Sequence, residues 1–215
     1  MVIDAQTAVT GLILAGGRAE RMGGRDKGLL LLAGEPLIAH SIRCLRPQVS
    51  ELLISANRHQ NIYQTFGYRV VSDHPELRFR GPLAGILAAM MVAQTPYLLT
   101  APCDAPLLPL DYARRMCAAL EQDPAAVSVV VTADCWQPVF ALLPVALRDD
   151  LADWLTTGQG GVGRWLQRHQ PALVAFPDRS TLFRNLNTPE DLAQLEVDFS
   201  CRRAEYCDDV GTRAH

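Results

Sequence analysis

The chain has 215 residues, of which 49% are hydrophobic and 20% are charged, a balance that is typical of a globular protein and excludes a disordered one. The formal net charge is −3 at pH 7, so the chain lacks the basic footprint of a nucleic-acid-binding protein. Its apolar stretches are shorter than the roughly 18 residues that a membrane span needs.

The first half of the chain alternates apolar runs with segments of helical periodicity. The run at residues 9–15 is long enough for a buried strand and too short for a helix. The expected strands are residues 9–15, 51–56, 69–73 and 96–104, and the expected helices are residues 36–45, 81–94 and 109–123, the first of them beginning at Pro36. This alternation indicates crossover units in a mostly parallel sheet.

The pattern changes in the second half. Residues 125–134 and 137–144 are separated by a connection too short for a crossover, so we expect a local antiparallel hairpin. The remaining expected elements are helices at 145–156 and 161–169, a strand at 172–177 and a helix at 188–196 that is capped by Thr188. The sequence therefore predicts an α/β protein with a three-layer, Rossmann-like fold and helices on both faces of the sheet. We expect a single domain at residues 1–197 and a polar tail at residues 198–215.

The segment LAGGRAERMGGRDKG, residues 14–28, joins glycine to positive charge directly after the first strand. Glycine lets backbone N–H groups approach a phosphate closely. The segment is not a Walker A motif, because Gly28 rather than Ser or Thr follows Lys27, and it has no G-x-G-x-x-G fingerprint. We expect Gly16 and Gly17 to approach a nucleotide, and Arg21 and Lys27 to reach its phosphates.

Two aspartates each lie at the end of a predicted strand. Because the carboxyl ends of parallel strands meet at one edge of a sheet, Asp73 and Asp104 would share that edge with Gly16 and Gly17. Mg²⁺ binds proteins through one or two carboxylates together with substrate phosphates, which makes Asp104 a candidate ligand. From the pattern alone, a role in a turn or a helix cap is an equal alternative for Asp104.

The chain resembles the molybdenum cofactor guanylyltransferases, a branch of the nucleotidyltransferase superfamily, over about residues 9–196. The resemblance is carried by the opening loop and by SANRHQNIY (55–63), GYRVVSDHP (67–75), GPLAGILAAM (81–90), PCDAPLLP (102–109) and NLNTPEDL (185–192). The related cytidylyltransferases typically have L-A-A-G where this chain has L-A-G-G. The resemblance implies an enzyme that transfers GMP from GTP to the terminal phosphate of molybdenum-molybdopterin and releases pyrophosphate, with Mg²⁺ as cofactor.

The resemblance also implies roles for individual residues. It makes Asp104 the Mg²⁺ ligand and a catalytic residue together with Arg21 and Lys27. The implied nucleotide-binding residues are Leu14, Ala15, Gly16, Gly17, Lys27, Ser55, Asn57, Asp73 and Gly81, and the implied acceptor-binding residues are Asn185 and Asn187. Ser55 stands where the family pattern has asparagine and carries no NH₂ donor. Tight helix–sheet packing is the alternative for the glycines of GPLAG, and loop stabilisation is the alternative for the two asparagines.

Two other functions stay open at this point. One is a cytidylyl- or sugar-nucleotidyltransferase with the same loop, and the other is a non-catalytic adaptor that binds a nucleotide and delivers the cofactor. The six cysteines show neither CxxC nor zinc spacing, and residues 1–10 lack the basic start of a signal peptide, so we expect reduced thiols and a cytoplasmic location. We expect a monomer that binds no nucleic acid or membrane and makes at most transient contact with molybdoenzymes or upstream cofactor-synthesis proteins.

Overall fold

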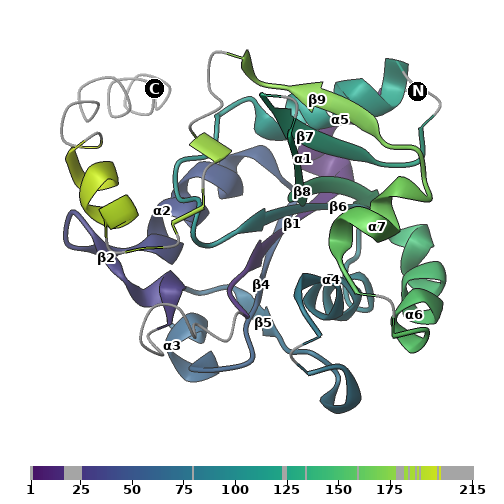
Figure 1. Ribbon diagram of the computed structural model, residues 1–215. Helices are drawn as coiled ribbons and strands as arrows, with labels where there is room; N and C mark the ends of the chain where they lie inside the picture. Colours follow the sequence, from purple (N-terminus) through teal and green to yellow (C-terminus); the bar gives the residue numbers. More distant parts are fainter. Residues whose placement is uncertain are drawn as a thin grey trace.

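The computed structural model describes residues 2–16, 26–78, 80–122, 125–133, 135–158, 160–177, 182–183, 185–186, 188, 190–197 and 199. Within them, seven strands form one sheet in the order β5-β4-β1-β6-β8-β7-β9 (Figure 1). The strands are β1 (Val9–Leu14), β4 (Glu51–Ser55), β5 (Arg69–Val71), β6 (Tyr97–Pro102), β7 (Ser128–Thr132), β8 (Cys135–Pro144) and β9 (Ala172–Ala175). Strands β5, β4, β1 and β6 are parallel, whereas β8 is antiparallel to both β6 and β7. This confirms the predicted parallel sheet with a local antiparallel element.

Helices cover both faces of this sheet, so the three predicted layers are present (Figure 1). Successive strand residues point to opposite faces, and in β1 Val9 and Ile13 pack on one side while Leu12 packs on the other. The first side is covered by α1 (Ala5–Ala8), α2 (Leu37–Leu45), α3 (Gln60–Gln64) and α5 (Tyr112–Gln122), and the second by α4 (Pro82–Met90), α6 (Arg148–Thr156) and α7 (Val162–Gln167). None of the helices described is long and apolar enough to cross a membrane.

Some boundaries differ from the prediction. The helix expected at residues 81–94 ends at Met90, because the chain must turn before Pro96, where β6 follows. Pro36 is not the first helical residue: it pairs with Leu31 in a small hairpin, and α2 begins one residue later. That hairpin, β2 (Leu31–Leu32) and β3 (Glu35–Pro36), was not expected, and neither were α1 and α3.

The pairing of β6 with β8 stops halfway along β6, and this opens the sheet beside the candidate site. The last paired residues are Leu99 and Leu142. At the next residue, the Thr100 hydroxyl donates to the carbonyl of Val139 over 2.8 Å and accepts from the N–H of Ala141 over 3.2 Å. A side chain thus replaces the backbone ladder, and the end of β6 diverges from β8.

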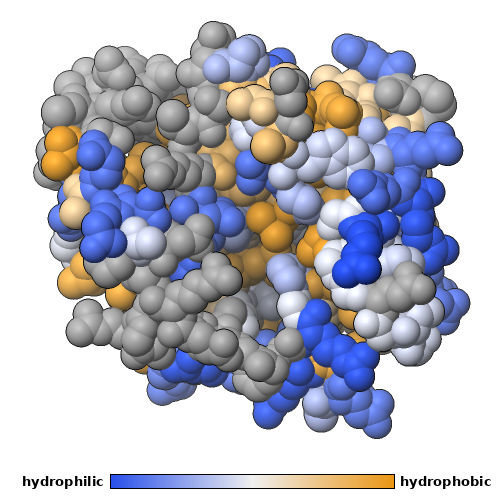
Figure 2. Space-filling view, viewed as in Figure 1, coloured by the Kyte–Doolittle hydropathy of each residue, from blue (hydrophilic) through white to orange (hydrophobic). Residues whose placement is uncertain are grey.

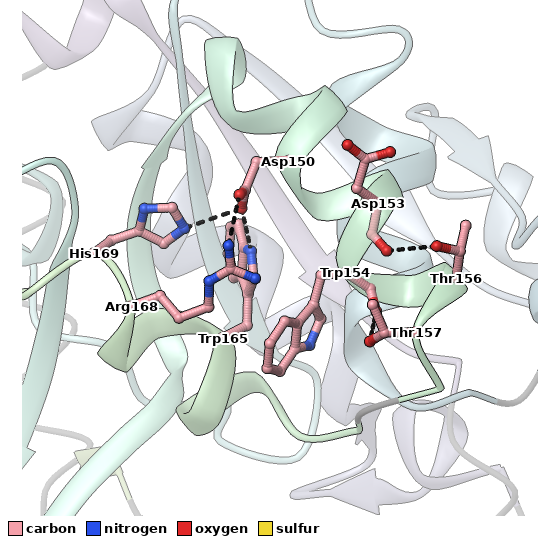
Figure 3. A network of polar contacts seen from close by, with 8 residues as sticks. All are labelled: Asp150, Asp153, Trp154, Thr156, Thr157, Trp165, Arg168 and His169. Carbon is pink, nitrogen blue, oxygen red and sulfur yellow. Dashed lines mark hydrogen bonds and ion pairs between the residues drawn. The ribbon is translucent and has the colours of Figure 1, made fainter.

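A polar network joins α6 to α7 on the second face (Figure 3). The Asp150 carboxylate accepts hydrogen bonds from the indole N–H of Trp165 over 2.8 Å and pairs with Arg168 and His169 at 3.3 and 3.2 Å. The Arg168 guanidinium also lies 5.0 Å from the centroid of the Trp154 ring. These contacts hold the two helices together.

Candidate active site

Four adjacent parallel strands end at one edge of the sheet, and most of the predicted site residues follow them. The ladder continues past the strand ends: the N–H of Ala15 donates to Ser55 and the N–H of Cys103 donates to Leu14. Gly16 is the second residue after β1, and a Cβ added there would lie 3.2 Å from the amide nitrogen of Asn57. Leu14, Ala15 and Gly16 are thus brought together with the ends of β4 and β6.

Asn57 and Asp73 form a reciprocal pair across the ends of β4 and β5. The Asn57 amide donates to Asp73 Oδ2 over 2.7 Å, and the backbone N–H of Asp73 donates to Asn57 Oδ1 over 3.0 Å. Asp73 is only 5% exposed. The structure thus shows that these two predicted nucleotide-binding residues position each other.

Lys27 and Asp104 form an ion pair at the end of β6. The lysine ammonium lies 2.9 Å from Asp104 Oδ2, and both side chains are partly buried. Lys27 is the single lysine of the chain; the other cationic residues are arginines and histidines. A lysine head group is a compact point charge, whereas the guanidinium of arginine is a planar fork. The single lysine therefore sets a compact positive charge against Asp104, the one candidate metal ligand.

The residue before Lys27 is held by α3. Asp26 Oδ1 accepts from the Tyr63 hydroxyl over 2.5 Å, and its Oδ2 lies 3.0 Å from His59 Nδ1. The Asp26 side chain also caps the short helix Lys27–Leu29 by accepting from the N–H of Gly28. Neither Asp26 nor Tyr63 was among the predicted site residues. The D-K-G sequence marks Asp26, but nothing in the sequence connects it to Tyr63.

Ser55 and Gly81 occupy different environments at this edge. Ser55 is 2% exposed, and its hydroxyl lies against Gly85 of α4, where an added Cβ would collide with it. This close contact agrees with the packing alternative for Gly85. Gly81 is exposed at the start of α4 with a φ of 84°, a left-handed conformation that favours glycine.

The segment at residues 185–186 reaches the same edge from the end of the chain. The backbone N–H of Leu186 donates to the carbonyl of Asp104 over 2.9 Å, and its side chain packs with Leu32 and Leu37. Asn185 therefore lies next in sequence to a residue bonded to Asp104. The predicted site residues Gly17, Arg21 and Asn187 lie outside the described residues.

Within the part of the chain that the structure describes, no three His, Cys, Asp or Glu side chains gather as a ready-made metal site. Asp104 offers one carboxylate at an open strand end, which fits the few protein ligands that Mg²⁺ takes when phosphates supply the others. Cysteine chemistry has little support here, because burial, with the nearby charges of Asp104 and Asp26, raises the pKa of Cys103 well above its ordinary value. Burial likewise raises the pKa of Cys117 to about 11.

The face of the molecule shown in Figure 2 is hollowed near its middle, and hydrophobic side chains are visible inside the hollow between polar ones. The site thus combines an open strand edge, backbone exposed at glycine, a carboxylate and a single ammonium group. That combination suits the binding of a phosphorylated ligand.

Comparison with known proteins gives a consistent result. A family model for the MobA-like NTP transferase domain matches residues 11–172. A molybdenum cofactor guanylyltransferase from Shewanella amazonensis is 46% identical over 187 residues, which cover 87% of this chain and 95% of the relative. A second, from Shewanella sp. strain W3-18-1, is 45% identical and covers 88% and 96%.

Solved structures share the fold. The molybdopterin-guanine dinucleotide biosynthesis protein A from Archaeoglobus fulgidus superimposes with a TM-score of 0.72 at 20% identity, covering 89% of this chain and 98% of that one. A 2-C-methyl-D-erythritol 4-phosphate cytidylyltransferase from Thermus thermophilus gives a TM-score of 0.68 at 18% identity, covering 89% and 98%.

Proposed function

The chain belongs to the MobA-like NTP transferase family, and from this premise we propose that it transfers GMP from GTP to the terminal phosphate of molybdenum-molybdopterin. The products are the guanine dinucleotide cofactor and pyrophosphate. The identity of 46% to a molybdenum cofactor guanylyltransferase over nearly its whole length supports the substrate pair. The structural observation that carries the proposal is the Lys27–Asp104 pair at the strand edge that also bears Gly16.

In the proposed reaction, an oxygen of the acceptor phosphate attacks the α-phosphorus of GTP in line. The new bond joins that oxygen to the α-phosphorus, and the bond from the α-phosphorus to the bridging oxygen breaks as pyrophosphate leaves. The attacking oxygen is already ionised at neutral pH, so the step needs no general base. Positioning and charge neutralisation then supply the catalysis.

Lys27 and Arg21 would stabilise the negative charge that grows on the leaving pyrophosphate. Asp104 would hold Mg²⁺, which when bound supplies further neutralisation of phosphate charge. The ion pair of Lys27 with Asp104 keeps the two charges of the site balanced before the substrate binds. Arrival of a metal nucleotide would give the carboxylate a cation and the ammonium an anion, so each group would exchange one partner for another.

The nucleotide is proposed to contact Leu14, Ala15, Gly16, Gly17 and Gly81 through the backbone, and Asn57 and Asp73 near their strand ends. The reciprocal bonds between Asn57 and Asp73 support a preorganised recognition unit. Burial of Ser55 supports an indirect role for it, through its contact with Gly85.

We place the acceptor beside Asn185 and Asn187, because the bond of Leu186 to the Asp104 carbonyl brings that segment to the metal ligand. We also propose that the protein acts in the cytoplasm as a monomer, with transient contact to its cofactor-handling partners.

The decisive experiment measures nucleotide binding by calorimetry, with GTP, CTP, ATP and UTP, each with and without Mg²⁺. We expect preferential binding of GTP that Mg²⁺ strengthens, and loss of the Mg²⁺ effect in Asp104→Ala. Pyrophosphate release is then measured with molybdenum-molybdopterin as acceptor, and Lys27→Ala is expected to lower kcat with little change in folding. A preference for CTP, or a kcat for Lys27→Ala within about twofold of the wild type, a barrier change under ~0.5 kcal/mol, would refute the proposal.

A further inference from the structure

We propose that Tyr63 is a positioning residue that acts through Asp26 to hold Lys27 in place opposite Asp104. The inference rests on the proposed function, since it assigns to Tyr63 a part in the placement of the lysine that meets the phosphates. Tyr63 lies in α3, which is 36 residues further along the chain than the lysine it would control. The glycine-rich sequence motif that contains Lys27 therefore gives no indication of a role for Tyr63.

Three hydrogen-bonding groups hold the side chain of Asp26, the residue that precedes Lys27. Its side chain is 9% exposed. A carboxylate this well buried is costly unless hydrogen bonds satisfy it. Its partners are the Tyr63 hydroxyl at 2.5 Å, His59 Nδ1 at 3.0 Å and the backbone N–H of Gly28 at 3.3 Å. Two of the three come from the α3 region, so that region fixes the residue immediately before Lys27.

Tyr63 is itself held firmly in the core. The ring is fully buried and packs with the core that lies under α2 and α5. Burial, with the neighbouring Cys103 thiol and Asp26 carboxylate, raises the pKa of the phenol, so the hydroxyl remains a donor throughout the accessible pH range. The remainder of α3 is mostly exposed, which leaves Tyr63 as the anchor of this short helix.

Tyr63 also approaches the backbone closely at Gly28, the residue after Lys27. A Cβ added to Gly28 would lie 2.5 Å from the Tyr63 hydroxyl and 3.3 Å from the sulfur of Cys103. The backbone next to Lys27 therefore packs closely against Tyr63 and against Cys103, the residue that follows β6. A lysine side chain is long and flexible, so its ammonium is placed only as well as its backbone is held. Here the ammonium reaches Asp104 at 2.9 Å.

The test uses the fact that Lys27 carries the only side-chain amine in the chain. Acylation by acetic anhydride, followed by mass spectrometry of the Lys27 peptide, reports the exposure and pairing of that one group, and the α-amine serves as the internal reference. In Tyr63→Phe, which removes only the hydroxyl, we expect the Lys27 amine to be acylated several-fold faster than in the wild type. Without the Tyr63 hydroxyl, the backbone at Lys27 is held less firmly and the ion pair of the Lys27 ammonium with Asp104 is weaker. The reagent then reaches the amine more easily.

Tyr112→Phe is the matched control. Tyr112 is also fully buried, and its hydroxyl donates one hydrogen bond, of 2.8 Å, to the carbonyl of Thr100. The control variant should lose stability to a similar degree and leave the acylation rate of Lys27 unchanged. Asp26→Asn is the second test variant, and it should speed acylation in the same direction as Tyr63→Phe.

The kinetic test is a double-mutant cycle with Lys27→Ala. Tyr63→Phe should lower kcat about tenfold, the effect of one lost charge-assisted hydrogen bond, and change the KM for GTP much less. In the Lys27→Ala background it should have no further effect, because the residue through which it acts is gone. Equal losses in both backgrounds, or unchanged acylation in both Tyr63→Phe and Asp26→Asn, would overturn the inference. If the wild-type protein shows no transfer of GMP, the proposed function fails, whereas acylation still decides the role of Tyr63.

Discussion

Gly28→Ala is the substitution for which the structure gives the sharpest expectation. The added methyl would lie 2.5 Å from the Tyr63 hydroxyl and 3.3 Å from the Cys103 sulfur. Nonbonded heavy atoms prefer a separation of about 3.5–4.0 Å, so the hydroxyl has to move by about 1 Å. Tyr63 is fully buried, and when its hydroxyl moves, the hydrogen bond to Asp26 lengthens or breaks.

Two costs follow. Overpacking of a well-filled core by one methyl costs ~1–3 kcal/mol, and we take this range to include the weakening of the hydrogen bond from Tyr63 to the buried carboxylate. For a chain of this size, a loss of ~1–3 kcal/mol lowers Tm by roughly 2–12 °C. Calorimetry or circular dichroism measures this shift, and kcat for GMP transfer should fall as well, because Lys27 is the neighbouring residue.

Gly160→Ala is the control for this measurement. Nothing lies within 4 Å of a Cβ added at Gly160, so its Tm should stay within about 2 °C of the wild type. If Gly28→Ala also left both Tm and kcat unchanged, Tyr63 would not pack tightly against the backbone beside Lys27, and the proposed role of Tyr63 in holding that backbone would be wrong.

Three further outcomes are expected. Thr100→Val keeps the shape of the side chain but leaves the buried N–H of Ala141 without its acceptor, so urea unfolding should show a loss of ~1–3 kcal/mol. Burial lowers the pKa of His40 below 6.5 in the folded protein. As the pH falls through 6.5, the imidazole therefore becomes protonated in the unfolded chain while it stays neutral in the folded one. The free energy of unfolding should therefore fall between about pH 7.5 and pH 5.5, and His40→Gln should flatten that slope; an unchanged slope contradicts the assignment. Asp150→Ala removes the acceptor of the fully buried Trp165 indole, which should lower stability by ~1–3 kcal/mol in urea while pyrophosphate release stays at the wild-type rate.

The sequence predicted the frame of the fold because the frame depends on local signals. The apolar runs of β1 and β6 are continuous and short, which is typical of strands buried on both faces. The β2–β3 hairpin escaped prediction because its turn, Ala33–Gly34, lacks the usual Asn-Gly or Asp-Gly signal, although both residues have positive φ as a tight hairpin turn requires.

The site was predictable where it depends on strand ends and not where it depends on long-range contacts. Lys27 and Asp104 stood out in the sequence as a cation and a carboxylate in separate motifs. Their direct pairing, and the reciprocal bonds of Asn57 with Asp73, come from the order of the strands in the sheet. One signal was available and unused: a chain with many arginines carries one lysine, and it lies in the glycine-rich loop.

The position of β1 in the middle of the parallel strands bears on how the chain is made. Thr10 pairs with Glu51, but the other edge of β1 is covered only when Val9 meets Tyr97. During synthesis, β1 and β4 can therefore associate well before β6 leaves the ribosome. Until then an apolar strand presents an open edge, which is the feature that promotes pairing between chains. In the interval between the synthesis of β5 and that of β6, this edge of β1 is therefore open to pairing with another chain.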